Sequence, residues 1–171
     1  MRRWVVLIAL LGAAAAAGTG VAVASPPDHF TDSLDYSSSD PGATPTHCGT
    51  FDDLWLGHLD VHGITTFDQQ GNPVKDVVHI SGWETNYRSD LPAVRFTAKR
   101  QWTVIYDYAT QTESDNGIIF SATAPGAGVL FHDVGSIRFD DATNELISVH
   151  GPHDVFDQGD AVFCQALQTI S

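Results

Sequence analysis

Hydrophobic and polar residues alternate along most of the chain after Cys48. The pattern is clearest in "AVRFTAKRQWTVIYDY", residues 93–108. A period of two residues indicates a β-strand, whose successive side chains point to opposite faces. Sixteen extended residues would span about 50 Å, longer than an ordinary strand, which predicts a bend or bulge near 98–100. One face would carry Val94, Phe96, Ala98, Arg100, Trp102, Val104, Tyr106 and Tyr108.

Other segments repeat this pattern between turn signals. The strand-like segments are "HLDVHGITTF", "VVHISGWETNY", "IIFSAT", "VLFHDVGSIRFD" and "ELISVH". Gly, Pro, Asn and Asp gather between them, as in "QQGNP", "SDNG" and "DATN". About seven strands at this spacing predict an all-β fold, either an antiparallel β-barrel or a β-sandwich. We favour the barrel, because closure protects the edges of long strands.

The last residues change to a helical period. Asp160 can cap a short helix whose apolar positions recur every three or four residues. Those positions are Val162, Phe163, Ala166 and Leu167, and Cys164 lies among them. The all-β domain is therefore predicted to end in a short C-terminal helix.

Residues 1–24 have the features of a signal peptide. Arg2 and Arg3 precede an uncharged run, and Ala22-Val23-Ala24 forms a cleavage signal before Ser25. An uncleaved membrane anchor is the alternative, but the apolar run is short. The sequence thus predicts a secreted protein with no membrane contact after cleavage.

Export bears on the two cysteines, Cys48 and Cys164. An isolated pair outside the cytoplasm usually forms a disulfide, and this one would join the start of the folded region to its end. The alternative is a nucleophilic or metal-binding cysteine, although no Cys-x-x-Cys spacing is present.

Residues 25–46 differ from the rest in composition. They are rich in Ser, Asp and Pro, and their large apolar residues are Phe30, Leu34 and Tyr36. Burial of these few apolar groups would offset little of the conformational entropy that the segment loses on ordering. A flexible segment is therefore predicted here. Residues 47–171 would then form a single β domain.

The charge balance narrows the possible partners. Eight Lys and Arg residues face 21 Asp and Glu residues, a formal net charge of −13. So acidic a surface repels phosphate backbones and anionic membranes, which argues against nucleic acid as a partner. The composition indicates neither a cofactor nor an oligomeric state.

The C-terminal third carries short motifs that resemble a known pattern. Residues 125–167 contain "PGAG", then "DVG", then "GPH" before the final cysteine. This combination resembles secreted β-rich proteins of actinobacteria that have no assigned function. The resemblance implies a secreted β fold and brings no catalytic residue with it.

Arg100 is the first candidate for a ligand-binding residue. On a strict period of two it shares a face with Phe96, Trp102 and Tyr106. A guanidinium in apolar surroundings needs an acidic partner, either a ligand or a protein carboxylate such as Glu84. The alternatives are a structural ion pair or a bulge that turns Arg100 outward.

Two histidine motifs suggest other chemistry. In "HLDVH", His58 and Asp60, or Asp60 and His62, lie about 6.6 Å apart on one strand face and could chelate a metal, although a solvated strand face explains them as well. "HGPHD", residues 150–154, is interpreted as a structural turn around Gly-Pro. A triad of Ser121 or Ser136 with "HD" at 132–133 lacks a nucleophile motif.

Three functions follow from these observations. The first is a secreted domain that binds a small, partly apolar molecule in or at the mouth of a barrel. The second is an enzyme, a cyclase, isomerase or hydrolase, that uses His79, His132 or Arg100 in the same cavity. The third is a non-catalytic surface or interaction protein.

Overall fold

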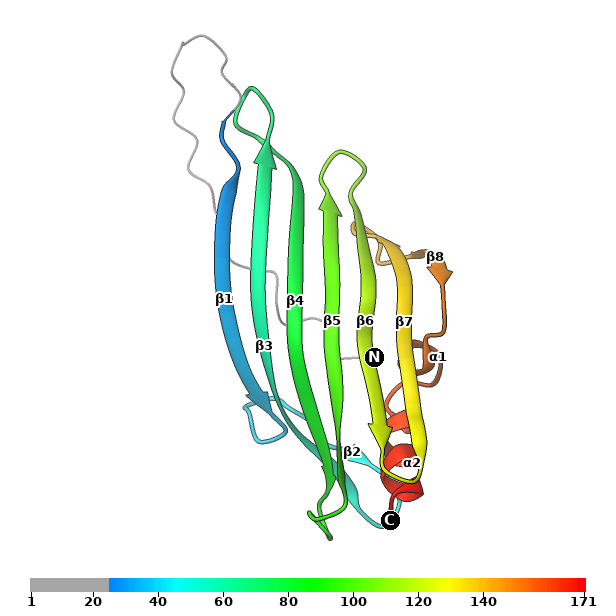
Figure 1. The fold of residues 1–171 in the computed structure, drawn as a ribbon. Coiled ribbons are helices and arrows are strands. Elements are labelled where there is room, and N and C mark those ends of the chain that lie inside the picture. Colours follow the sequence, from blue (N-terminus) through cyan, green and yellow to red (C-terminus); the bar gives the residue numbers. More distant parts are fainter. Residues whose placement is uncertain (1–24) are drawn as a thin grey trace.

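The computed structural model describes residues 25–171, so the predicted signal peptide lies outside the described residues. An antiparallel sheet of eight strands dominates the fold, in the order β1-β3-β4-β5-β6-β7-β8, with the short β2 paired to β3 (Figure 1). The strands and helices are β1 (Asp28–Ser37), β2 (Thr46–His47), β3 (Asp52–Phe67), β4 (Pro73–Arg88), β5 (Arg95–Asp107), β6 (Thr112–Ala124), β7 (Gly128–Asp140), β8 (Leu146–His150), α1 (Asp154–Gln158) and α2 (Ala161–Thr169).

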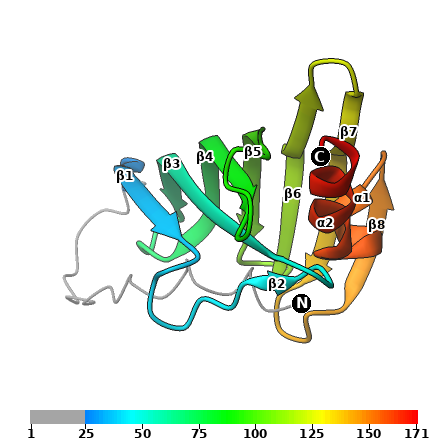
Figure 2. The ribbon, with the colours of Figure 1, turned by 90° about the horizontal axis from the view of Figure 1, so that it is seen from below.

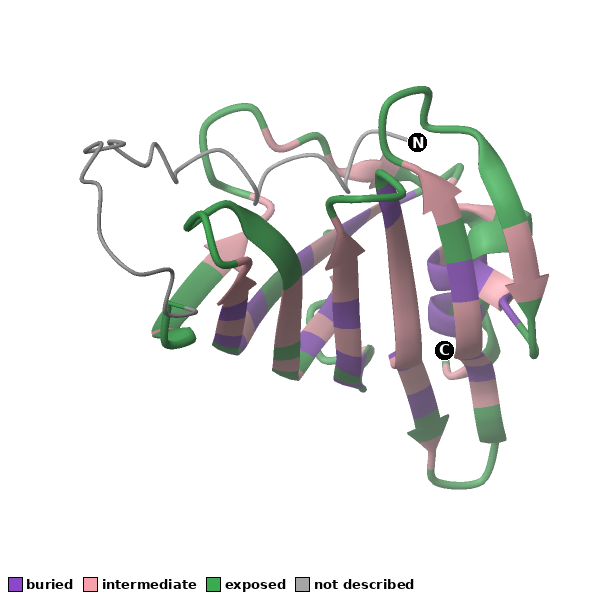
Figure 3. Ribbon diagram, turned by 90° about the horizontal axis from the view of Figure 1, so that it is seen from above, coloured by how far each residue is buried: buried purple, intermediate pink, exposed green. Residues whose placement is uncertain are grey.

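The two faces of the sheet differ in burial. Along β3 and β5, buried residues alternate with more exposed ones, as the banded strands show (Figure 3). We call the side with the buried residues the inner face and the other side the outer face. The sheet curves around the inner face, where α2 packs against β3, β4, β5 and β7 (Figure 2). Phe120 and Phe131 contact Phe163 of α2 there, edge to face.

The prediction of a bend or bulge near residues 98–100 of β5 is wrong, because the bulge at this level lies on the neighbouring strand β6. The β5–β6 register shifts between Lys99 and Gln101, and the β6–β7 register shifts between Ile118 and Phe120. One extra residue in β6 accounts for both shifts, as in a β-bulge. Both Ile119 and Phe120 are buried as a result. Strand β5 itself runs without interruption, which keeps Arg100 on the inner face.

The prediction of a flexible segment is wrong for residues 28–37, which form β1. This strand pairs with β3 over its whole length. Phe30 and Tyr36 lie directly over Gly63 and Gly57 of β3, where a Cβ atom would collide with either ring. The two glycines of β3 therefore leave room for the rings of β1 to pack on this strand. The composition of β1 alone does not reveal this packing surface.

The all-β antiparallel prediction, the C-terminal helix and the Cys48–Cys164 disulfide are confirmed. Closure into a barrel is not confirmed. Within residues 25–171, β1 and β8 are the two edge strands of the sheet and do not pair with each other. Packing of α2 on the inner face buries apolar side chains without closure of the sheet. The charged aspartates of β1 oppose pairing of this edge strand with other chains. No helix in the described part of the chain is long and apolar enough to cross a membrane.

Candidate functional site

Arg100 lies in a polar network on the inner face, together with Tyr36, Glu84 and Asn86. Arg100 Nη1 donates a hydrogen bond to Tyr36 Oη at 2.8 Å, and Tyr36 Oη donates to Glu84 Oε2 at 2.9 Å. Arg100 Nη1 lies 3.6 Å from the same carboxylate oxygen. Asn86 Nδ2 donates to Glu84 Oε1 at 3.0 Å. The network joins β1, β4 and β5.

The surroundings of this network are apolar. Arg100 is 8% exposed, and its guanidinium lies 4.2 Å from the ring centre of Phe120 and 4.8 Å from that of Trp102. Burial, followed by the Glu84 carboxylate, raises the pKa of Tyr36, so the tyrosine keeps its proton and its hydroxyl donates the hydrogen bond to Glu84. The proposed pairing of Arg100 with Glu84 is therefore present, and the positive charge is balanced inside the protein.

The other predicted ligand residues share the inner face with Arg100. Phe96 and Trp102 are buried in the core. Tyr106 lies near the far end of β5 and donates a hydrogen bond to Asp141. The structure thus brings Phe96, Arg100 and Trp102 together as packed core residues. Their role in ligand binding stays a prediction.

Carboxylates and tyrosines gather at the end of the inner face away from α2. Tyr108 Oη donates to Asp76 Oδ2 at 2.7 Å, and the bond to Asp141 raises the pKa of Tyr106 to about 12. Asp115 lies on β6, two residues after Glu113, which pairs with Tyr106. Asp115 itself pairs with Val104 on one side and Ile137 on the other. Burial there, with smaller contributions from Glu113 and Asp133, raises the pKa of Asp115 to about 7.

The raised pKa of Asp115 predicts a pH-dependent stability. An unfolded aspartate has a pKa of 3.8, so between pH 4 and 7 the folded state binds more protons than the unfolded state. Stability should therefore fall as pH rises through this window. Asp115→Asn should raise the free energy of unfolding above pH 7 by a few kcal/mol and leave it nearly unchanged at pH 4. Thermal melts from pH 4 to 8 measure this, with the exposed Asp28→Asn as control. Equal pH profiles for Asp115→Asn and the parent would contradict the assignment.

"HGPHD" is a turn, as predicted, and it also anchors α1. Strand β8 ends at His150, Gly151 has a φ of +102°, and α1 begins at Asp154. His153 and Asp133 are each 1% exposed, and His153 Nδ1 lies 2.6 Å from Asp133 Oδ1. Nε2 of the same ring lies 3.1 Å from the carbonyl oxygen of His150. Asp154 accepts a hydrogen bond from the backbone N–H of His132 rather than from the turn.

Two glycines allow this close packing. A Cβ atom on Gly135 would collide with the carbonyl oxygen of His150, and one on Gly151 would collide with that of Val134. The "DVG" and "GPH" motifs therefore meet in space, since Asp133 and His153 form one buried pair between β7 and α1. The motifs have a structural explanation that requires no catalysis.

The histidines proposed for an enzyme lie on the outer face. His79 Nδ1 lies 2.9 Å from Thr103 Oγ1, and His132 Nδ1 lies 2.9 Å from Ser121 Oγ. Arg100 lies on the opposite face. The expectation that these groups share one cavity is therefore wrong, because strict alternation along β4 and β7 turns both histidines away from the core.

His58, Asp60 and His62 also lie on the outer face. His58 Nδ1 bonds Asp35 Oδ1 at 2.7 Å, and its Nε2 lies 3.3 Å from Asp60 Oδ1. The bond to Asp35 raises the pKa of His58. Within residues 25–171, no three or more His, Cys, Asp or Glu side chains are arranged to hold a metal ion.

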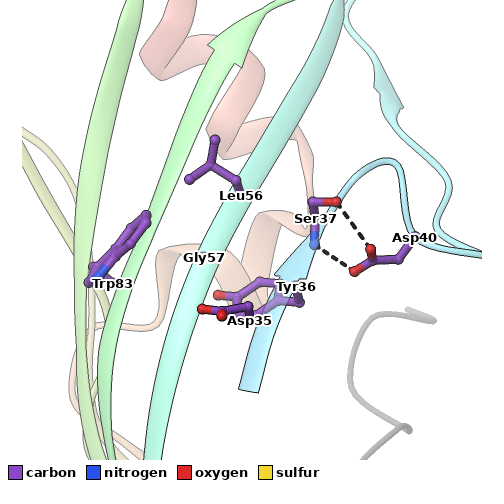
Figure 4. A pocket seen from close by; sticks show the side chains of 7 residues that line it. All are labelled: Asp35, Tyr36, Ser37, Asp40, Leu56, Gly57 and Trp83. Carbon is purple, nitrogen blue, oxygen red and sulfur yellow. Dashed lines mark hydrogen bonds between the residues drawn. The ribbon is translucent and has the colours of Figure 1, made fainter. Parts of the chain in front are cut away.

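The outer face has a depression of about 300 Å³ between β1, β3 and β4. Trp83 and Leu56 line it and are 40% and 41% exposed. Figure 4 shows Trp83 on one side of the depression and Ser37 and Asp40 on the other. Asp40 is held by Ser37, whose backbone N–H donates to Asp40 Oδ2 at 2.7 Å. The site combines an apolar floor with carboxylate and hydroxyl groups.

This site is not among the sites predicted from the sequence. In "HISGWET", Trp83 shares its strand face with His79 and Ser81. An aromatic residue in phase with polar ones is a signal for an exposed ring. That signal was available from the alternation alone.

A second outer-face depression, of about 490 Å³, lies across the middle of the sheet. His62, His79, Ser81, Gln101, Thr103 and Asn116 are among its lining residues. Ser81 and Trp83 are two residues apart on β4, so about 7 Å separates the two depressions along the strand. The two sites therefore lie next to each other on one continuous face.

Comparison with protein-family models, with curated protein sequences and with solved structures finds no match to this chain. The resemblance of the C-terminal third to secreted actinobacterial proteins therefore stays a prediction. Any functional conclusion must come from the geometry described above.

Proposed function

We propose that this protein is a secreted, non-catalytic domain that binds a small, partly apolar molecule on its outer face. The binding site is the depression beside Trp83. The disulfide fits an oxidising compartment outside the cytoplasm. The acidic composition keeps such a protein soluble and away from anionic partners.

The exposure of Trp83 and Leu56 in one depression is the observation that carries this proposal. Their strand positions hold them in one depression with Asp35 and Asp40. Large apolar side chains are costly to leave in water, and tryptophan is enriched at binding sites because its ring offers a wide contact area. A volume of about 300 Å³ is at the lower end of the range for small-molecule sites.

The geometry supports a binding protein better than an enzyme. The histidine rings of His79 and His132 bond hydroxyl groups, and among residues 25–171 no carboxylate is hydrogen-bonded to either ring to orient it for proton transfer. The buried His153–Asp133 pair is enclosed in the core, where no substrate reaches it. Arg100 is neutralised by Glu84.

A neutral fluorescent probe, N-phenyl-1-naphthylamine, tests the proposal. We expect saturable binding to the protein, with quenching of Trp83, the most exposed of the described tryptophans. Trp83→Ala should weaken binding at least tenfold, or about 1.4 kcal/mol. Leu146→Ala is the matched control, because Leu146 is similarly exposed but lies on β8. No saturable binding, or equal losses in both variants, would refute the proposal.

A further inference from the structure

The polar residues around the second depression form a row that crosses the sheet. His62 pairs with His79, His79 with Thr103, and Thr103 with Asn116. The row continues through Ser136 to His150 on β8. It therefore spans six strands at one level of the outer face, with neighbours about 4.8 Å apart.

The chemistry of this row is uniform. Its members carry hydroxyl, amide or imidazole groups, and each of these both donates and accepts hydrogen bonds. Gln101 and Ser81 in the next row have the same property and also line the depression. A partner that matches such a surface has many groups that can each donate and accept hydrogen bonds. The hydroxyl groups of a sugar have this property.

Trp83 supplies the complementary apolar contact. The face of an indole ring is electron-rich, and the C–H groups on the flat side of a sugar ring carry partial positive charge, so the two stack favourably. Asp35 and Asp40, across the depression from the ring, can accept hydrogen bonds from the hydroxyl groups at the sugar's edge. A purely apolar ligand would make no hydrogen bond to these carboxylates, whose partners within the protein are Ser37 and His58.

The charge of the protein selects among saccharides. A net charge of −13 repels acidic polysaccharides as it repels nucleic acid. The row itself has no Arg or Lys side chain that would balance a sulfate or uronate. Beside Trp83, Lys99 of β5 is one cation on the outer face, and Asp35 and Asp40 in the depression outnumber it. A neutral saccharide meets no such repulsion.

We infer that the ligand is a neutral oligosaccharide or polysaccharide that stacks on Trp83 and extends across the second depression. This inference rests on the proposed function, because it assigns a chemical class to the same Trp83 site. The second depression adds length to the site and requires a ligand of more than one sugar ring.

Native gel electrophoresis of the full protein in gels that contain soluble neutral polysaccharides tests this inference. Hydroxyethylcellulose, galactomannan and laminarin are suitable probes, and polygalacturonate is the anionic control. At least one neutral polysaccharide should retard the protein, and polygalacturonate should not. Trp83→Ala should lower the apparent affinity at least tenfold and His79→Ala several-fold, whereas Leu146→Ala should have no effect.

The outcomes separate the two claims. Absence of retardation by every neutral polysaccharide overturns the saccharide assignment, as does retardation that neither Trp83→Ala nor His79→Ala reduces. If N-phenyl-1-naphthylamine still binds in a Trp83-dependent manner, the binding function stands and the ligand class is wrong. If neither the naphthylamine nor any polysaccharide binds, both claims are wrong.

Discussion

Replacing Arg100 with methionine should lower the free energy of unfolding by about 3–5 kcal/mol, because Glu84 would remain buried without its positive partner. Tyr36 would also lose the hydrogen bond that it accepts from Arg100. Urea denaturation measures the change. Arg95→Met is the control: Arg95 lies on the same strand but is exposed, so its loss should have little effect.

A double variant identifies the cause. Arg100→Met combined with Glu84→Gln removes both charges, and it should recover part of the stability lost in the single variant. If Arg100→Met is as stable as the parent, the ion pair makes no net contribution, and Arg100 becomes available again as a ligand anchor.

The second large effect should come from His153→Leu. The substitution leaves the Asp133 carboxylate in a fully buried position without the imidazole that lies 2.6 Å away, and we expect a loss of about 3–5 kcal/mol. The pair also holds α1 against β7, since Asp133 Oδ2 accepts the backbone N–H of Phe156. Urea denaturation again provides the measurement.

His150→Leu is the matched control, because this histidine belongs to the same motif but is exposed and contributes its carbonyl oxygen to the contact. Its stability should stay within about 0.5 kcal/mol of the parent. Similar losses in the two variants would show that the turn itself, rather than the buried pair, depends on histidine.

Most of the sheet could be predicted from the alternation of apolar and polar residues. That pattern fixes which side chains face inward, and it placed Arg100 correctly beside Phe96 and Trp102. The C-terminal helix and the disulfide were also predictable, because each has a local or compositional signal. Chain order alone cannot show whether the first and last strands meet, so closure into a barrel was not predictable.

Contacts between distant segments account for the remaining errors. β1 has few apolar residues, and its stability depends on Gly57 and Gly63, which are more than twenty residues away in sequence. The partner of His153 is Asp133, 20 residues away on β7, and no local signal in "HGPHD" indicates this pair. Trp83 is exposed although tryptophan is usually buried, so its residue type alone does not indicate the outer-face site, whereas its phase along β4 does.

Fluorine NMR of the protein labelled with 5-fluorotryptophan tests the proposed binding face most directly. Trp83 lies on the outer face, whereas Trp55 and Trp102 lie on the inner face, and Trp→Phe variants assign the three resonances. On addition of N-phenyl-1-naphthylamine, the Trp83 resonance should shift in a saturable manner while those of Trp55 and Trp102 stay in place. A shift of Trp102 without a shift of Trp83 would place the ligand on the inner face and contradict the proposed site.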